Sequence, residues 1–209
     1  STVALTLAVP FAVDARLTSA IWAVAGVGIV WAGLRQARRF HVLWGGLIQL
    51  GAAAFYASEV VDGFVRSGDF AQTRWLGLFD STVVSGVLIA VAALLTGYLT
   101  LAALRRGERL LVAGDYLLIS WGATLWGLAW WYGTGIYAVA TYFLNDSDSL
   151  APFAIFFVLS AAVGEWLGGR FQWRAVRLTS LLLWAVIGIT ALIHAIISGP
   201  LLVGWGWLV

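Results

Sequence analysis

The segment Leu17–Leu34 is the feature that most limits how this chain can fold. It runs for about eighteen residues without a charged side chain, between a polar turn that holds Asp14 and Arg16 and an arginine cluster that begins at Arg35. At about 1.5 Å per residue, a helix of this length crosses the hydrocarbon core of a bilayer. Because arginine collects on the cytoplasmic side of membrane helices, the segment also predicts how the chain is oriented.

Composition places the whole chain in the same class. The 209 residues are 62% hydrophobic and 11% charged, whereas a soluble domain carries about 25% charged residues. The mean hydropathy is +0.93. So little charge cannot cover a surface that faces water, and the lipid bilayer is the expected partner. The excess of basic residues is interpreted as a topology signal, with no nucleic-acid partner.

Metal and cofactor sites are not expected. The chain has no cysteine, which excludes disulfides, thiol catalysis and metal sites with cysteine ligands. Its two histidines, His41 and His194, are far apart in the sequence, so a histidine-rich metal site is not indicated either.

Further apolar segments predict an all-α, polytopic transmembrane helical bundle with about five full spans and partial spans at both ends. The further segments are Phe40–Val60, Ser81–Leu104, the shorter Tyr116–Tyr132, Leu150–Leu167 and Ala175–Ile197. The partial spans, Ser1–Val9 and Leu201–Val209, indicate a fragment of a longer membrane protein. Residues 1–209 are expected to form a single transmembrane region.

The connections between spans carry their own signals. Thr18 is predicted as the N-cap of the first span, and Asp80 or Ser81 as the cap of the third. Residues 61–80 are predicted to form an outer loop with a short interfacial helix, because aromatic residues stand among its charges. Gly133–Leu144 is only moderately apolar and is expected to lie in or near the outer interface.

The predicted order of spans places most basic residues on one side of the membrane and most acidic residues on the other. Nine of the twelve basic residues, all of them arginine, fall in the predicted inner loops, and seven of the ten acidic residues fall outside. The alternation does not break across six loops. The sequence therefore predicts that the arginine-rich connections face the cytoplasm.

Several phrases resemble a recurring segment of large bacterial membrane proteins, the domain of unknown function 2339 family. The shared pattern is a proline, an Asp-x-Arg turn, Trp-Ala, a glycine and Trp-x-Gly-Leu-Arg. Its residues here are Pro10, Asp14, Arg16, Trp22, Ala23, Gly26, Trp31, Gly33, Leu34 and Arg35. The resemblance covers most of the chain and implies the bacterial inner membrane, but no activity. Ala25, and Ile136 or Tyr137, stand where family copies often carry an acidic residue.

The candidate ligand or partner site lies at the outer face. It comprises Asp14, Arg16, Glu59, Asp80, Trp126, Trp130 and Trp131. Trp126 and Trp130 are four residues apart and share a helix face, which suits stacking on a sugar ring or a lipid headgroup. The alternatives are a capping turn for the first pair, solvated loop charges for the other acids, and an aromatic belt for the tryptophans.

The polar candidates within the membrane are Gln49, His194, Asp115 and Glu165. Asp115 and Glu165 lie near predicted inner ends, where pairing with Arg109 and Arg170 is the expected role. Two small-residue pairs, Gly164 with Gly168 and Ala123 with Gly127, allow close helix approach.

Three functions stay open. The leading hypothesis is a non-catalytic scaffold or assembly subunit of an envelope complex, with membrane-protein partners or as a homo-oligomer, because no reactive set converges in the sequence. A transporter or channel module predicts a hydrated path lined by Gln49, Ser120 or His194. A membrane enzyme acting on lipid-linked glycans predicts that outer acids such as Asp80 converge beside Trp130.

Overall fold

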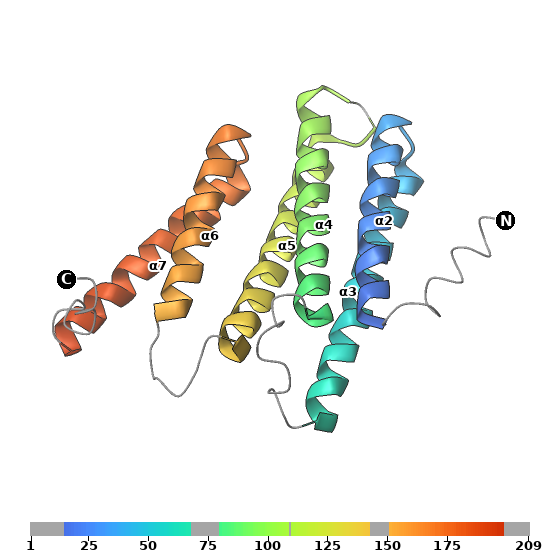
Figure 1. Ribbon diagram of the computed structural model, residues 1–209. Helices are drawn as coiled ribbons and strands as arrows, with labels where there is room; N and C mark the ends of the chain where they lie inside the picture. The colour runs from blue at the N-terminus through green and yellow to red at the C-terminus, as the bar shows by residue number, and fades with distance from the viewer. Residues whose placement is uncertain (1–14, 68–79, 109, 143–150, 199–209) are drawn as a thin grey trace. The chain divides into compact units, whose positions relative to one another are not determined.

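The computed structural model describes residues 15–67, 80–108, 110–142 and 151–198, and shows long α-helices joined by connections (Figure 1). The chain divides into two compact units, Ser1–Ser147 and Asp148–Val209. The prediction that residues 1–209 form a single transmembrane region is not tested by this division and stays a prediction. The two units are described separately below.

Among its described residues, the first unit holds four helices: α2 (Ala15–Arg35), α3 (Arg39–Ser67), α4 (Ser81–Arg105) and α5 (Ala113–Tyr142). The described part of the second unit is a hairpin of two helices: α6 (Ala151–Arg170) and α7 (Arg174–Ser198). Within the described residues every regular element is a helix.

In the part of the chain that the structure describes, five helical segments are long and apolar enough to cross a membrane: Arg16–Arg35, Arg39–Val61, Ser81–Arg105, Ala151–Arg170 and Arg174–Leu192. The predicted all-α, polytopic fold is confirmed. Helix α5 is not among the five, yet it has 30 residues and packs against α4. At about 1.5 Å per residue it is about 45 Å long, enough to match the depth of α4.

Three predicted helix boundaries were wrong. Helix α2 begins at Ala15, so Thr18 is not its N-cap; this side chain is 3% exposed and packs inside the unit. Helix α3 continues to Ser67, beyond the predicted start of the loop at residue 61. Helix α5 runs from Ala113 through Gly133 to Tyr142, beyond the predicted segment Tyr116–Tyr132, and Thr134 in this extension packs against Gly86 of α4.

Other predictions fall on residues outside the described ranges. These are the interfacial helix within residues 68–79 and the partial spans at residues 1–9 and 201–209. The predicted cap of α4 is confirmed as Asp80, whose carboxylate accepts a hydrogen bond from the backbone N–H of Thr82.

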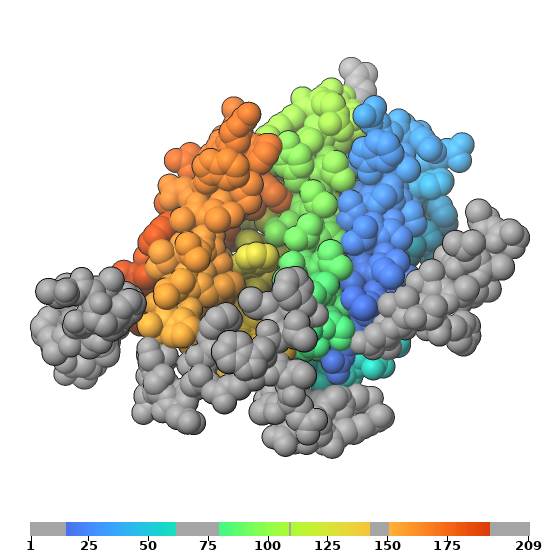
Figure 2. Space-filling view, viewed as in Figure 1, coloured from blue at the N-terminus to red at the C-terminus, as the bar shows by residue number. Residues whose placement is uncertain are grey.

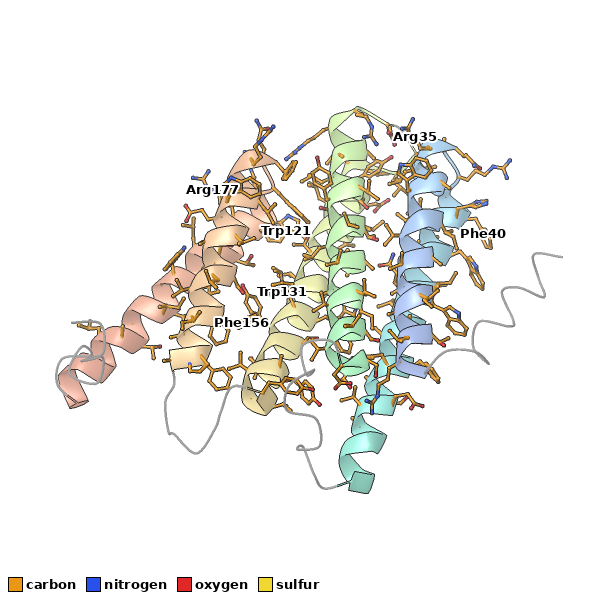
Figure 3. The ribbon with its side chains drawn as sticks, viewed as in Figure 1. Arg35, Phe40, Trp121, Trp131, Phe156 and Arg177 are labelled. Atoms are coloured by element: carbon orange, nitrogen blue, oxygen red, sulfur yellow. The ribbon has the colours of Figure 1, made fainter. Side chains whose placement is uncertain are left out.

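The two ends of the first unit differ in chemistry. One end carries the α2–α3 turn and the α4–α5 connection, and we call it the arginine end after Arg35, Arg38, Arg39, Arg105 and Arg106. We call the opposite end the Asp80 end. The Nε of Arg39 donates to the carbonyl oxygen of Leu110 at 2.5 Å, which joins the two connections. Both lie at one end of the unit in Figure 1, and Figure 3 labels Arg35 there. Successive helices therefore alternate in direction, as membrane crossings require.

Glycines bring the helices of the first unit into backbone contact. A Cβ added to Gly26 of α2 would lie 2.7 Å from the carbonyl oxygen of Gly45 in α3, and one added to Gly45 would lie 2.6 Å from that of Gly26. Between α4 and α5, a Cβ added to Gly97 would lie 2.5 Å from Oγ1 of Thr124. Gly127 lies equally close to α4, as its predicted small-residue role requires. Helix α2 also packs on α4, and Figure 2 shows the two side by side on one face.

The hairpin α6–α7 has the same register as the hairpin α2–α3. Gly33 packs on Val42 across the first hairpin, and Gly168 packs on Arg177 across the second. In each, the backbone N–H five residues after the glycine donates back to the glycine carbonyl, at 2.9 Å and 2.8 Å. The residue before that donor has φ 52° in both turns. Gly164 also packs on α7, against Ser180, so the predicted GxxxG pair is a helix contact.

Candidate functional site

A cavity of about 340 Å³ opens among α3, α4 and α5 toward the Asp80 end of the first unit. It is lined by Tyr56, Val60, Thr82, Trp126, Ala129, Trp130, Gly133, Thr134 and Tyr137. Small-molecule sites in proteins have volumes from about 300 Å³ upward. The cavity therefore has the size of a binding site, and we call it the aromatic pocket.

Helix periodicity explains the wall that α5 contributes. Its lining residues recur at intervals of three and four from Trp126 to Tyr137, which places them on one face of the helix. Tyr56 and Val60 are four residues apart on α3 and form the facing wall. Because α3 packs chiefly on α2 while α5 packs on α4, space remains between the two walls.

Aromatic contacts close the inner part of the pocket. The ring centroids of Tyr56 and Trp130 are 5.4 Å apart at an interplanar angle of 70°, and those of Trp126 and Trp130 are 5.7 Å apart at 85°. Such edge-to-face pairs stabilise the arrangement beyond the burial of their area. The contact between Trp126 and Trp130 confirms that they share a face. Among the described residues, Trp130 is one whose ring nitrogen is buried without a hydrogen-bond partner.

A hydrogen-bond network forms the polar rim of the pocket. The hydroxyl of Tyr56 donates to the carbonyl oxygen of Thr82 at 2.6 Å. An Nη1 of Arg16 donates to the hydroxyl oxygen of Thr82 at 2.8 Å, which sets a guanidinium beside a residue that lines the pocket. At the rim, the positively charged guanidinium of Arg16 therefore lies next to Thr82, a residue of the pocket lining.

Asp80 lies next to this rim and has a structural role. One carboxylate oxygen accepts from the backbone N–H of Thr82 at 3.3 Å and from the hydroxyl of Ser81 at 3.5 Å. The other accepts from the hydroxyl of Tyr142 at 3.1 Å. Asp80 therefore caps α4 and ties it to the last turn of α5, as an acidic residue at a helix N-terminus favours.

The structure gathers part of the predicted outer-face site. Arg16, Asp80, Trp126 and Trp130 contribute to the pocket or its rim, as described above. Glu59 is half-buried on α3 beside Val60 but does not line the pocket, and neither does the half-buried Trp131. Asp14 lies outside the described residues.

Seven of the nine lining residues were missed by the sequence analysis: Tyr56, Val60, Thr82, Ala129, Gly133, Thr134 and Tyr137. Tyr137 could have been found, since it continues the helix face of Trp126 and Trp130 by two further turns. Tyr56 and Thr82 come from other helices, and no spacing in the sequence relates them to α5.

The polar candidates within the membrane differ in burial. Gln49 is 7% exposed, and its Nε2 donates to Oγ1 of Thr96 in α4 at 2.8 Å. Asp115 is exposed in the first turn of α5, and Glu165 is half-buried on α6. His194 belongs to α7, but its side chain lies outside the described ones. The pairings with Arg109 and Arg170 stay predictions.

The hydroxyls at mid-depth of the first unit are also engaged. Ser120 donates to the carbonyl oxygen of Gly97 at 2.8 Å, and Thr124 donates to the carbonyl oxygen of Ser120 at 2.7 Å. Thr100 donates to the carbonyl oxygen of Thr96 at 2.7 Å. These bonds join or stay within the helices, so these side chains act in helix packing.

Within the described residues, no group of three or more His, Cys, Asp or Glu side chains is placed to hold a metal ion. The aromatic pocket is thus the candidate site, and its chemistry is that of apolar contact with a cationic rim. No family model, curated protein or solved structure matches the chain.

Proposed function

We propose that this chain is a multi-pass protein of the bacterial inner membrane that serves as a non-catalytic scaffold or assembly subunit of an envelope complex. The observation that carries the proposal is the closed centre of the first unit. Gly26 and Gly45 hold α2 and α3 in backbone contact, and Gln49 bonds to α4. A block in which the buried side chains of Gln49, Ser120 and Thr124 bond internally is suited to holding partners in fixed positions. The bacterial location is part of the proposal and is what a resemblance to the domain of unknown function 2339 family would imply.

Transport is the weaker alternative. A transporter or channel needs a polar path at mid-depth. Gln49 and Ser120, two of the side chains expected to line it, are 7% and 2% exposed and bond to neighbouring helices. Neither lines the aromatic pocket.

One observation favours a membrane enzyme acting on lipid-linked glycans as the second candidate. Asp80 lies beside the rim of a pocket that Trp130 lines, which is the convergence that an enzyme requires. Against this, both oxygens of Asp80 accept hydrogen bonds within the protein. A carboxylate held in this way stabilises a fold more readily than it accepts a proton from a substrate.

The scaffold is tested by the mass of the native assembly. The full-length protein, extracted in native-lipid nanodiscs, is expected to give one discrete mass that exceeds the monomer, with a fixed ratio of subunits. The variant Asp80→Asn should give the same mass, since asparagine also caps helices and accepts hydrogen bonds. A monomer at every concentration tested would contradict a scaffold, and a normal assembly in which Asp80→Asn abolishes glycan turnover would establish the enzyme instead.

The orientation is tested by labelling. Because the chain has no cysteine, single cysteines at Arg38 and Asp146 are the sole thiols in their variants. A thiol reagent that does not cross membranes, added to intact cells, is expected to label Asp146→Cys and to leave Arg38→Cys unlabelled until the membrane is opened. Labelling of both from outside would contradict the proposed topology.

A further inference from the structure

We propose that the aromatic pocket binds one hydrocarbon chain of an anionic phospholipid, and that Arg16 holds its phosphate. The lipid comes from the leaflet at the Asp80 end. This site goes beyond the proposed scaffold role, since it assigns a ligand class to a surface of the first unit.

The dimensions of the pocket fit one extended chain. Its α5 wall runs from Trp126 to Tyr137, two residues that stand eleven positions apart and therefore about 16 Å apart along the helix at about 1.5 Å per residue. Dividing 340 Å³ by this length of about 16 Å gives a mean cross-section of about 21 Å². The pocket, which we also call the slot, has room at this mean cross-section for one hydrocarbon chain lying along the helix.

Polarity changes along the slot as it does along a lipid. Thr82 and the hydroxyl of Tyr56 lie at the rim, where Arg16 also bonds. Trp126, Ala129 and Trp130 form the deeper part. In a bilayer the rim lies toward the headgroups and the deeper part faces hydrocarbon, so the slot and a lipid have matching polarity from end to end.

Water is a poor occupant of this slot. At about 30 Å³ per molecule, a volume of 340 Å³ corresponds to about eleven waters, each of which needs two or more polar partners. The described polar atoms of the lining are few, and the Tyr56 hydroxyl already donates to a backbone carbonyl. A hydrocarbon chain buries the apolar wall without needing such partners.

Arg16 supplies the charge that selects the headgroup. A guanidinium carries five N–H donors in a planar fork, and the bond to Thr82 uses one. Arginine binds phosphate oxygens through two parallel hydrogen bonds, and such charge-assisted bonds are stronger than neutral ones. A phosphate whose charge no choline offsets is therefore the preferred headgroup.

Gly133 offers a way to fill the slot without disturbing the fold. It lines the pocket, and a Cβ added there meets no atom within 4 Å. The variant Gly133→Leu therefore places a side chain in the slot, and leucine is a better helix former than glycine. Gly122 is also on α5 and exposed, a Cβ there meets no atom within 4 Å, and it lies outside the lining. Gly122→Leu is thus the matched control.

The experiment counts bound lipid. Full-length protein and both variants are delipidated in detergent and titrated with phosphatidylglycerol, and native mass spectrometry reports the lipids retained. The wild type and Gly122→Leu are expected to retain one phosphatidylglycerol at saturation. Gly133→Leu is expected to bind it about tenfold more weakly or worse, since expelling even two methylenes has that effect.

A second variant that fills the pocket allows the test to be completed if the first one does not fold. If Gly133→Leu does not fold, as judged by helical circular dichroism, Ala129→Leu fills the same slot from an exposed position on α5. Binding by a folded filling variant that equals the wild type would overturn the proposal. Equal weakening by Gly122→Leu would overturn it too, because the loss would then not come from the pocket.

The headgroup is tested separately. The wild type is expected to prefer phosphatidylglycerol to phosphatidylcholine about tenfold, and Arg16→Gln is expected to bind both equally, at the affinity of the wild type for phosphatidylcholine. An unchanged preference in Arg16→Gln would refute the role of Arg16. A wild type without any preference would show that the slot takes chains irrespective of headgroup and would overturn the anionic lipid.

Discussion

Replacing Gly45 by alanine is expected to destabilise the first unit by about 1–3 kcal/mol, although alanine is intrinsically the better helix former. The added Cβ would lie 2.6 Å from the carbonyl oxygen of Gly26 and 2.9 Å from the backbone nitrogen of Val30. Both are backbone atoms and cannot rotate away, so α2 and α3 must separate. That separation also weakens the contact of Gln49 with Thr96 in α4. The free energy of unfolding in mixed micelles of increasing sodium dodecyl sulfate measures the effect.

The neighbouring glycine supplies the control. A Cβ added to Gly46 meets no atom within 4 Å, so Gly46→Ala should be neutral or stabilise the helix by up to about 1 kcal/mol. The two substitutions are chemically identical and adjacent, and they differ only in the face of α3. Equal effects at both positions would mean that α2 and α3 do not meet through their backbones.

Removing the carboxylate of Asp80 is the second large change. Asp80→Ala is expected to destabilise the protein by about 1–3 kcal/mol, the sum of a lost N-cap and of a lost hydrogen bond from Tyr142. The first turn of α4 then has unpaired backbone donors, and the last turn of α5 loses its tie to α4. Thermal melting followed by circular dichroism, with SDS unfolding as a second measure, reports the change.

Two further variants separate the contributions. Tyr142→Phe removes only the bond to α5 and should have the smaller effect of about 0.5–1.5 kcal/mol. Asp80→Asn keeps one oxygen that accepts from Thr82, and its side-chain NH2 can donate to the hydroxyl oxygen of Tyr142, so this variant should lie closest to the wild type. If Asp80→Asn were as unstable as Asp80→Ala, the charge and not the hydrogen bonds would stabilise the end of α4.

The helical spans could be predicted because hydrocarbon imposes a local rule. An uncharged run such as Leu17–Leu34 has to bond its own backbone in the membrane, whatever it packs against. The ends of the helices were predicted less accurately from the sequence, because tertiary packing overrides weak local signals such as a capping residue. Thr18 looks like a cap but is buried within α2, and the span predicted to end at Tyr132 continues as α5 to Tyr142.

The candidate site could be predicted only along one helix. Trp126 and Trp130 share a face because of their spacing, and their rings do touch. Nothing in the sequence relates them to Tyr56, which comes from α3 and contacts Trp130 at 5.4 Å. That contact depends on the distance between α3 and α5. Helix α3 packs mainly on α2, α2 packs on α4, and α4 packs on α5, so these contacts set that distance.

The repeated hairpin was also predictable only in part from the sequence. The pattern Gly-x-Arg-x-x-x-Arg occurs at Gly33 and again at Gly168, and a comparison of the two segments would have found it. That both glycines pack on the following helix in the same register is a property of the folded turns alone.

By itself the sequence determined the class of the protein, its helical spans and the segregation of its arginines, because each of these follows from the free energy of moving a local segment from water into lipid. The tertiary structure decided the division into two units, the depth of Gln49, and the pocket that joins Tyr56, Thr82 and Trp130. These depend on contacts between segments far apart in the chain, where a single glycine sets how closely two helices approach. Hydropathy carries no information on such distances. In a membrane helix, a face that contacts lipid and a face that packs on another helix are both apolar, so the sequence does not distinguish them.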